Sequence, residues 1–239
     1  MTHSNEHVRL VNYLGVDYTK LEIIMRKRIF ITATNTGIGK TYTTQLLLKE
    51  FASRGFLVGV IKLIETGVVD GYAPDGEALL ECVKGLNPKL WALEIEDIVP
   101  ITYELPAAPF VASKNTAVDF KKMQTKIEEM EASCDLLLIE GAGGLYVPID
   151  EHTMMIDLIS RFHAVALLVT HCSLGCINDT LLSKKALSDR AIPHAVAFNC
   201  RENDASFSTV SEPYFLQSGF KVLKVKEDID TLCDVLYNL

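Results

Sequence analysis

The sequence is poor in positive charge and contains no long apolar run. It carries 23 Lys and Arg against 31 Asp and Glu, a formal net charge of −8 over 239 residues. Apart from the short basic run at residues 26–28 there is no basic cluster, so we expect no nucleic-acid partner. No apolar stretch reaches the roughly 18 residues that a membrane-spanning helix needs, and the N-terminus lacks the layout of a signal peptide. We therefore expect no membrane partner and a cytoplasmic location.

Paired cysteine and histidine motifs are also missing. The six cysteines, at positions 82, 134, 172, 176, 200 and 233, never form a Cys-x-x-Cys pair, so the sequence signals neither a zinc site nor a redox pair. We expect all six to be reduced packing residues. The six histidines are scattered. His171 follows a predicted strand, where it either contacts a ligand or packs at the strand end.

No interior segment rich in proline, glycine or serine divides the chain, which favours one large α/β domain over two small ones. We place this domain at residues 25–239. Residues 1–24 show no clear hydrophobic period, and a translation start at Met25 would still produce a complete α/β domain. We interpret residues 1–24 as an N-terminal appendage that is either poorly ordered or loosely docked.

Short runs rich in aliphatic and β-branched residues alternate with helical patterns along the chain. This alternation predicts an α/β fold with a mostly parallel sheet and helices on both faces. In such a fold, functional groups gather at the carboxyl ends of the strands. The candidate strands cover residues 28–33, 57–61, 136–139, 164–169, 195–199 and 221–225, and the candidate helices cover 41–53, 76–83, 120–132, 156–161, 177–186 and 229–236.

Residues 34–41, which read Thr-Asn-Thr-Gly-Ile-Gly-Lys-Thr, lie between the first candidate strand and the first candidate helix. This context predicts a phosphate-binding loop and hence a phosphate-loop NTPase fold. Glycines let backbone N–H groups approach phosphate oxygens, Lys40 adds a positive charge, and Thr41 offers a hydroxyl to Mg²⁺. Thr34 stands where the usual pattern has its first glycine. The alternative is an ordinary glycine-containing turn between a strand and a helix.

Two further strand ends carry charged residues. Lys62 follows the second candidate strand; it is either a solvated charge or, beside Lys40, a second ammonium for an anionic co-substrate. Glu140 follows the third candidate strand and precedes a glycine-rich turn, an arrangement suited to holding magnesium, with a solvated glutamate as the alternative. Asp75 begins an amphipathic stretch and is predicted to cap a helix and to face a cation. Asp70 competes with it as a metal ligand.

The motifs at residues 33–41, 62–67, 140–149 and 174–178 together resemble the dethiobiotin synthetases of biotin biosynthesis. Their order and spacing, spread over residues 26–200, carry the resemblance. It implies that ATP, carbon dioxide and 7,8-diaminopelargonate become dethiobiotin, ADP and phosphate. One amine of the substrate becomes a carbamate, the carbamate attacks the γ-phosphate, and the second amine closes the ring with loss of phosphate. It also implies Mg²⁺ as cofactor and ATP as co-substrate.

The resemblance implies a role for each matching position. Lys62 corresponds to a carbamate-binding lysine, Lys40 to the group that stabilises the transferring phosphoryl group, and Thr36 and Thr66 to hydroxyls that contact the diamine. The implied catalytic set is Lys40, Lys62, Thr36 and Glu140, and the implied magnesium ligands are Thr41, Asp75 and Glu140. The implied nucleotide contacts are Gly37, Ile38, Gly39, Lys40, Thr41, Tyr42, Asp75, Glu140, Gly141, Ala142, Gly143, Asn199 and Cys200, with Asn199 reading the adenine edge.

A fourth motif implies a shared site. Gly175, Cys176, Ile177 and Asn178 open a candidate helix, and the family binds the distant carboxylate of the diamine at this helix start across a homodimer interface. Free N–H groups and the helix dipole favour an anion there. The alternative is a glycine-containing turn with Asn178 in the first helical turn.

Three positions depart from the pattern of the family. Ala33 replaces a glycine, which a negative φ would tolerate, and Leu63 replaces a proline, which we expect to loosen the turn. Residues 219–226 lack a proline-bearing loop that packs on the base, so we expect weak preference for adenine.

Three other functions compete with this interpretation. A ParA- or MinD-like regulatory ATPase would carry a second lysine at positions 33–35, which is absent here. An amidotransferase-type synthetase would need a glutaminase domain that 239 residues leave no room for. A nucleotide-binding scaffold would not couple phosphate release to the diamine and bicarbonate.

Overall fold

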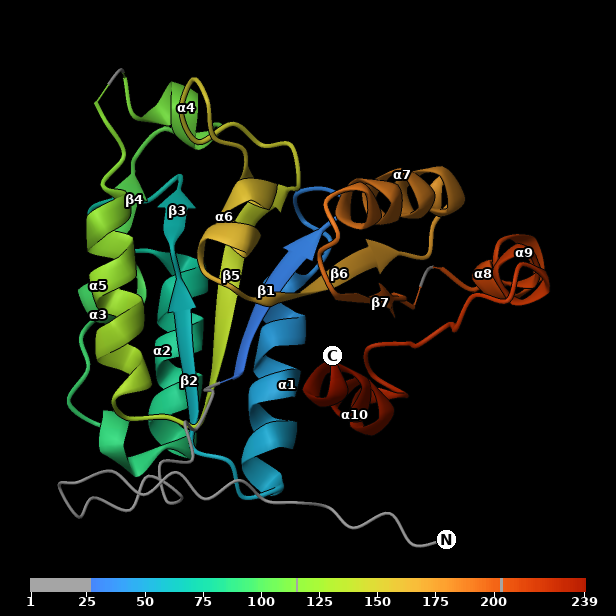
Figure 1. Ribbon diagram of the computed structural model, residues 1–239, viewed down its shortest axis with the longest axis horizontal. Helices are drawn as coiled ribbons and strands as arrows, with labels where there is room; N and C mark the ends of the chain where they lie inside the picture. Colours follow the sequence, from blue (N-terminus) through green and yellow to red (C-terminus); the bar gives the residue numbers. More distant parts are fainter. Residues whose placement is uncertain (1–26, 115, 203) are drawn as a thin grey trace, which may run out of the picture.

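The computed structural model describes residues 27–114, 116–202 and 204–239. Its centre is a parallel sheet of five strands in the order β2-β5-β1-β6-β7 (Figure 1). Because both neighbours of β1 come later in the chain, the strand order reverses beside β1, the position at which α/β sheets open a binding crevice. The strands are β1 (Lys27–Ala33), β2 (Val58–Lys62), β5 (Leu136–Gly144), β6 (Val165–His171) and β7 (His194–Asn199).

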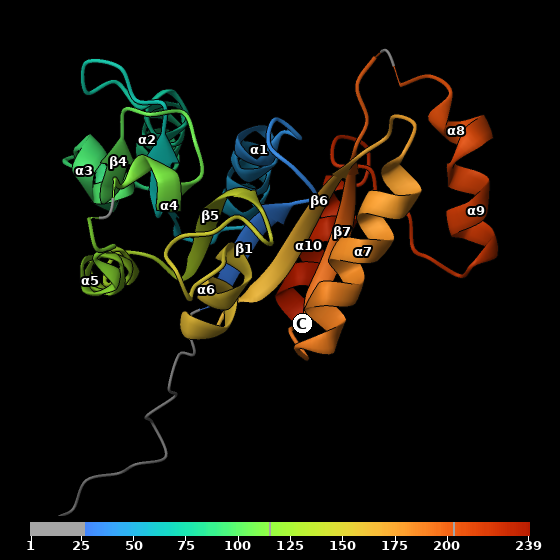
Figure 2. The ribbon, with the colours of Figure 1, turned by 90° about the horizontal axis from the view of Figure 1, so that it is seen from above.

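Helices cover both faces of this sheet (Figures 1 and 2). On one face, α1 packs on β1, β2 and β5 and is flanked by α2 and α10, while α5, α6 and α7 pack on the other face. The helices are α1 (Lys40–Ser53), α2 (Pro74–Leu86), α5 (Phe120–Glu131), α6 (Met155–Arg161), α7 (Cys176–Asp189) and α10 (Ile229–Asn238). The prediction of an α/β fold with helices on both faces is confirmed.

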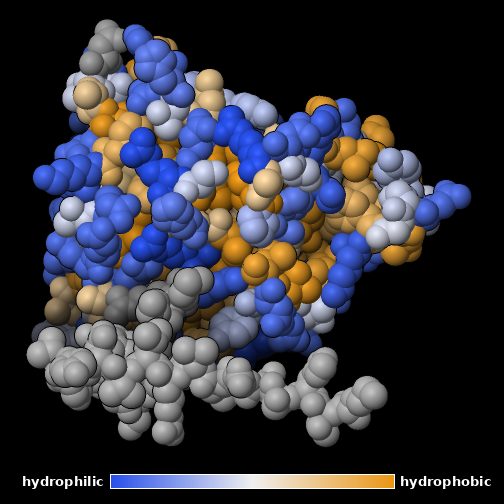
Figure 3. Space-filling model, in the orientation of Figure 1, coloured by the Kyte–Doolittle hydropathy of each residue, from blue (hydrophilic) through white to orange (hydrophobic). Residues whose placement is uncertain are grey.

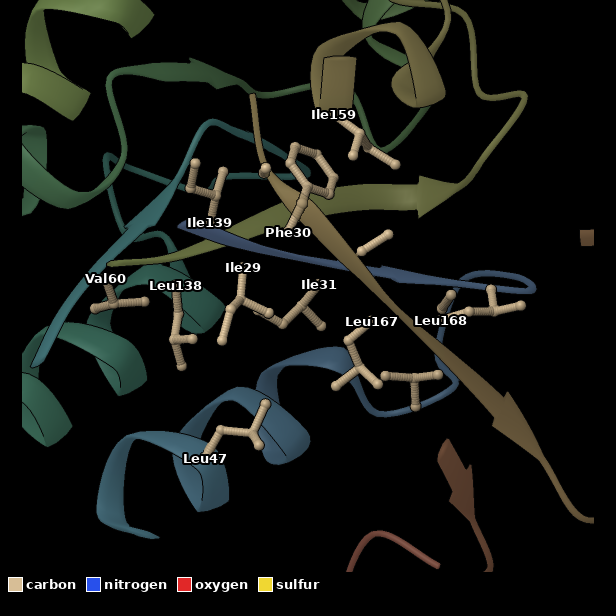
Figure 4. Packing of buried hydrophobic residues seen from close by; sticks show 14 of the residues in the cluster. Ile29, Phe30, Ile31, Leu47, Val60, Leu138, Ile139, Ile159, Leu167 and Leu168 are labelled. Atoms are coloured by element: carbon tan, nitrogen blue, oxygen red, sulfur yellow. The ribbon is translucent and has the colours of Figure 1, made fainter. Parts of the chain in front are cut away.

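The core consists of two apolar layers, one on each side of the sheet. Ile29 and Ile31 of β1 point toward Leu47 of α1, whereas Phe30 points toward Ile159 of α6 (Figure 4). All five side chains are completely buried. Since both faces are covered, β1 reads as a continuous apolar run rather than an alternating one.

Two short parallel strands, β3 (Ile64–Thr66) and β4 (Ile101–Tyr103), form a separate small sheet after β2. It follows directly after Lys62, so the chain continues from β2 along the rim of the carboxyl edge. The sequence did not predict this pair or the short helices. Those helices are η2 (Pro88–Leu90), α3 (Ile95–Ile98), α4 (Pro109–Ala112), α8 (Phe207–Val210) and α9 (Glu212–Gln217).

The helices α8 and α9 form a lobe at one side of the molecule (Figure 1). Phe207 and Phe215 from the lobe contact Phe198 of β7, with ring centroids 5.3 and 4.9 Å away. Figure 3 shows hydrophobic residues gathered between the lobe and the body of the protein. These aromatic contacts attach the lobe to the end of β7.

The prediction of a strand at residues 221–225 is wrong. This segment meets β7 through one parallel bridge, between Lys224 and Phe198. The N–H of Lys224 donates to Asp228 instead of a strand, so the pairing does not propagate. The other five predicted strands and all six predicted helices overlap observed elements.

The predicted appendage at residues 1–24 lies outside the described residues. None of the helices in the described part of the chain has both the length and the apolar character that crossing a membrane requires.

Candidate active site

The loop between β1 and α1 has the backbone shape of a phosphate-binding loop. Gly37 and Gly39 have φ values of 73° and 100°, in the left-handed region that favours glycine. A Cβ on Gly39 would lie 2.1 Å from Nδ2 of Asn199. Side chains are therefore excluded at this position by both conformation and space. Ala33, in contrast, is not among the residues with positive φ, so its replacement of a glycine causes no strain.

Lys40 begins α1 directly after this loop, and its side chain reaches β5. Its Nζ donates to the backbone oxygen of Gly143 at 3.1 Å, and the residue is only 8% exposed. The pKa of Lys40 is lowered to about 8, chiefly by burial; attraction to Glu140 and Asp75 opposes this shift, and repulsion from the nearby Lys62 adds to it. A bound polyphosphate would supply the negative charge that a buried ammonium lacks.

Lys62, at the carboxyl end of β2, lies between two carboxylates. Its Nζ is 2.8 Å from Oε1 of Glu140 and 3.0 Å from Oδ2 of Asp75, and the residue is 3% exposed. Burial alone would lower the pKa of Lys62, but attraction to Glu140 and Asp75 outweighs it and holds this pKa well above its usual range. Lys62 is therefore a permanent positive charge at the sheet edge, and the alternative of a solvated surface lysine is wrong.

Glu140 is completely buried and is the centre of this network. Besides Lys62, it contacts the hydroxyls of Thr41 and Thr44, which lie 2.8 Å from Oε1 and Oε2. The alternative of a solvated glutamate is thereby excluded. Thr44 was not predicted, although it lies three residues after Thr41 on the same face of α1.

Asp75 does not cap α2 as predicted. The N-cap is Ala73, and the N–H groups of Asp75 and Gly76 donate to the two carboxylate oxygens of Glu65, at 2.9 and 2.8 Å. Attraction to Lys62 outweighs burial and lowers the pKa of Asp75, so this side chain is an anion. Asp70, its competitor, lies in an exposed turn with φ of 50° and does not line the cavity.

The residues around Thr41 fit a magnesium ion. Mg²⁺ is commonly held by one or two carboxylates together with substrate phosphates, and Thr41, Asp75 and Glu140 supply hard oxygen donors beside the phosphate-binding loop. The two carboxylates already share one cation, the Lys62 ammonium. No cluster of three or more His, Cys, Asp or Glu suited to a metal occurs in residues 27–114, 116–202 and 204–239.

Lys40, Thr41, Lys62 and Asp75 border one cavity of about 670 Å³, which is the size of a typical small-molecule site. Glu140 is not part of its lining and lies buried behind Thr41 and Lys62. The predicted substrate residues Thr36 and Thr66 both line it. Sequence reasoning missed Glu65, residues 106–109 and Val147, which complete its wall. The Pro-Ala-Ala-Pro run at 106–109 could have suggested a rigid loop. Also in the lining are Gly37, Gly39, Lys40, Thr41, Lys62, Ile64, Asp75, Ala142 and Gly143.

The predicted nucleotide residues are divided between this cavity and its surroundings. Ile38 lines a second pocket, which shares Thr36 and Gly37 with the first. Gly141 is buried, and Tyr42 is exposed on α1. Asn199, at the end of β7, donates from Nδ2 to the backbone oxygen of Ile38 at 2.7 Å. This bond ties the strand end to the phosphate-binding loop.

The prediction that all six cysteines are reduced is wrong for two of them. Cys172 and Cys200 follow the adjacent strands β6 and β7, and a disulfide joins them across a Cα–Cα distance of 4.9 Å. They are 28 residues apart in sequence, so local spacing gives no sign of the pairing. The remaining cysteines, Cys82, Cys134, Cys176 and Cys233, are not disulfide-bonded.

The motif at residues 175–178 lies at the start of α7, outside the cavity of about 670 Å³. Gly175 is the N-cap with φ of 99°, and the Cys176 side chain is buried while Asn178 is exposed. His171 lies nearby, with Nε2 3.0 Å from Asp179. It borders the second pocket, of about 350 Å³.

Leu63, which replaces the proline of the family pattern, does not loosen the turn after β2. Its side chain is 1% exposed, and its N–H donates to the backbone oxygen of Glu140. Proline could not make this bond.

Comparisons with known proteins agree with this geometry. A protein family described as an AAA domain matches residues 27–231. The chain is 46% identical to the ATP-dependent dethiobiotin synthetase of a Sulfurovum species over 78% of its length and 89% of that protein. It is 36% identical to the ATP-dependent dethiobiotin synthetase of Wolinella succinogenes, over 88% of its length and 98% of that protein.

Among solved structures, a plasmid partition protein from Borrelia burgdorferi aligns with a TM-score of 0.52, covering 89% of this chain and 96% of the other. The two sequences are only 10% identical, so this likeness concerns the fold alone. The identities of 46% and 36% with the two dethiobiotin synthetases, in contrast, extend over most of the chain. The chain belongs to the family of ATP-dependent dethiobiotin synthetases.

Proposed function

We propose that this chain converts 7,8-diaminopelargonate, carbon dioxide and ATP into dethiobiotin, ADP and phosphate. One observation carries the proposal: Lys40 and Lys62, from different elements, border the same cavity beside Thr41, Asp75 and Glu140. A phosphate-binding loop alone would serve any ATPase. A second, permanently charged lysine at the sheet edge provides for another anion next to the triphosphate.

Lys62 binds the first intermediate. An amine of the substrate attacks carbon dioxide, forms a C–N bond and releases a proton to solvent, which leaves a carbamate anion. The Lys62 ammonium has three N–H donors, of which two face Asp75 and Glu140. The third is available for a carbamate oxygen, and the charged hydrogen bond stabilises that anion.

Lys40 and the loop backbone act on the second step. A carbamate oxygen attacks the γ-phosphorus and the bond to ADP breaks, which yields a carbamic–phosphoric anhydride. Charge accumulates on the phosphoryl oxygens in this step, and the buried Lys40 is positioned to offset it. Mg²⁺, when held by Thr41, Asp75 and Glu140, would neutralise charge on the β- and γ-phosphates.

The cavity walls assist ring closure. The second amine attacks the carbonyl carbon, the C–O bond to phosphate breaks, and phosphate leaves as the ureido ring forms. Residues 106–109 and Val147 present mostly apolar surface to the cavity, which limits the access of water to the anhydride. Thr36 and Thr66 supply hydroxyls that orient the amines.

The distant carboxylate of the diamine requires a separate anion site. We assign it to Gly175, Cys176, Ile177 and Asn178 of a second copy, in a homodimer whose active sites are shared. The start of a helix favours an anion through its dipole, and Gly175 leaves the N-cap of α7 without a side chain. The cytoplasmic location stays a prediction.

Isotope labelling tests this function. With ¹³C-bicarbonate, ATP and 7,8-diaminopelargonate, we expect mass spectrometry to find dethiobiotin labelled at its ureido carbonyl. A reaction without ATP is the control and should give no labelled product. A regulatory ATPase of the ParA or MinD type would instead consume ATP and form no dethiobiotin, which would refute the proposal.

A further inference from the structure

We propose that Glu65 is a positioning residue that holds Asp75 in place for the magnesium-bound nucleotide. This inference rests on the proposed function and assigns a role to a residue that the family resemblance leaves without one. Glu65 lies on β3, three residues after Lys62 in the chain, and it borders the same cavity. It does not contact Lys62 through a hydrogen bond; both of its oxygens face the start of α2.

The first turn of α2 depends on Glu65 for its hydrogen bonds. The N–H groups at a helix start have no partners within the helix and are usually satisfied by a Ser, Thr, Asp or Asn side chain at the N-cap. The N-cap here is Ala73, which offers no side-chain acceptor. Glu65 Oε1 accepts from the N–H of Asp75 at 2.9 Å and Oε2 accepts from Gly76 at 2.8 Å.

Gly76 allows the start of α2 to lie close to the Glu65 carboxylate. A Cβ on Gly76 would lie 2.2 Å from Cγ2 of Val99 and 3.2 Å from Oε2 of Glu65. Glycine therefore permits the close approach on which the second hydrogen bond depends. Because Val99 and Glu65 both lie close to Gly76, the backbone at Gly76 has little room to shift.

The free-energy cost of burying the Glu65 carboxylate indicates that Glu65 does more than cap α2. Glu65 is only 4% exposed, and burying a carboxylate costs more than placing a hydroxyl at the N-cap. Burial raises the pKa of Glu65, and hydrogen bonds from Asp75 and Gly76 only partly oppose that shift. The buried cap does what a local one would not: it connects the strand segment after Lys62 to the helix turn that carries Asp75.

The position of Asp75 has a direct consequence for the site. Its Oδ2 lies 3.0 Å from Nζ of Lys62, and half of its side chain is exposed. Besides its interactions with Lys62 and Thr41, the backbone position that Glu65 fixes determines where this carboxylate lies. Groups behind a metal ligand typically contribute about 10–100-fold to metal affinity or activity. Loss of the Glu65 hydrogen bonds should therefore weaken the use of Mg²⁺ more than the binding of the diamine.

A double-mutant cycle tests this inference with the full chain. The variants are Glu65→Gln, Asp75→Asn and both together, and the readouts are kcat, the KM for 7,8-diaminopelargonate, and the Mg²⁺ dependence of binding of a non-hydrolysable ATP analogue by calorimetry. We expect Glu65→Gln to raise the Mg²⁺ concentration for half-maximal binding about 10–100-fold. In the Asp75→Asn background the same change should have an effect within about twofold.

Glu131→Gln is the matched control, since Glu131 is a buried carboxylate that pairs with Arg28 away from the cavity. It should lower the melting temperature and leave the Mg²⁺ dependence unchanged. If Glu65→Gln does not fold, Glu65→Asp, which keeps the charge but shortens its reach, takes its place. If Glu65→Asp also fails to fold, Glu65 is a folding residue and the positioning role is refuted.

Independent effects of the two substitutions, or a wild-type Mg²⁺ dependence in Glu65→Gln, would overturn the inference. So would a change confined to the KM for the diamine. If the wild-type chain makes no dethiobiotin, the proposed function fails, but the calorimetric comparison still decides the role of Glu65.

Discussion

Replacing Lys62 by methionine separates its two roles, as a structural counter-charge and as a ligand for the carbamate. Methionine keeps most of the length and apolar stem of lysine but removes the ammonium. The buried Glu140 then loses its 2.8 Å ion pair, and Asp75 loses its 3.0 Å contact. Lys126→Met is a matched control, because Lys126 also bridges two carboxylates, Asp97 and Glu129, but at the surface.

The size of the effect follows from burial. Removing one partner of a buried ion pair costs about 3–5 kcal/mol, and the half-exposed side chain of Asp75 argues for the lower end. For a chain of this size, each kcal/mol shifts the melting temperature by roughly 2–4 °C, so we expect a decrease of about 6–12 °C. Exposed pairs contribute about 0–1 kcal/mol, so Lys126→Met should shift the melting temperature far less.

Activity should fall further than stability explains. Loss of one preorganised charge typically reduces the rate about 10²–10³-fold, and we expect that loss in dethiobiotin formation at a temperature where Lys62→Met is fully folded. Thermal unfolding followed by circular dichroism and product detection by mass spectrometry give the two values. Near-wild-type turnover by folded Lys62→Met would refute the assignment of Lys62, and an equal loss of activity in Lys126→Met would show that the effect is not specific.

Four other predictions concern different parts of the site. The pKa of Lys40 is lowered to about 8, so Lys40 is charged below that pH and loses its charge above it. We therefore expect kcat/KM for ATP to fall about tenfold per pH unit above pH 8. A fall that begins only near the usual pKa of lysine, about 10.4, would contradict this. Residues 219–226 lack the proline-bearing loop, so we expect kcat/KM to favour ATP over GTP and CTP by less than about 10³. The reason is that one polar group left unpaired by the wrong base costs only roughly 1–3 kcal/mol. A larger preference would show a closed base pocket. Asn178→Asp should raise the KM for the diamine far more than that for ATP in a protein that scattering shows to be a dimer, and a fully active monomer would exclude a shared site. Thiol titration of the unfolded, unreduced protein should find four titratable thiols, and six would show that Cys172 and Cys200 are not paired.

The parts of the site that lie at strand ends were predictable from sequence. Lys62 and Glu140 each follow an apolar run, Lys40 follows the loop that comes after another such run, and parallel strands bring their carboxyl ends to one edge. Periodicity and turn residues are enough to place such groups. Asp75 also lines the cavity, but the local pattern that suggested an N-cap there was misleading, because Ala73 holds that position.

What sequence reasoning missed depends on contacts between distant segments. From β3, a strand of three residues that pairs with β4, Glu65 accepts hydrogen bonds from the start of α2, and no local periodicity marks so short an element. Cys172 and Cys200 pair because β6 and β7 are neighbours in the sheet, which a separation of 28 residues does not reveal. Residues 221–225 have the composition of a strand, but only one residue of that segment forms a bridge with β7.

The coupling of ATP use to both other substrates tests the proposed function most directly. ADP release and dethiobiotin formation are measured together, first with all substrates and then without 7,8-diaminopelargonate or in buffer depleted of carbon dioxide. We expect one ADP for each dethiobiotin with all substrates present, and only background ADP release when either is omitted. ATP turnover that continues undiminished without the diamine would contradict the assignment of this site to dethiobiotin synthesis.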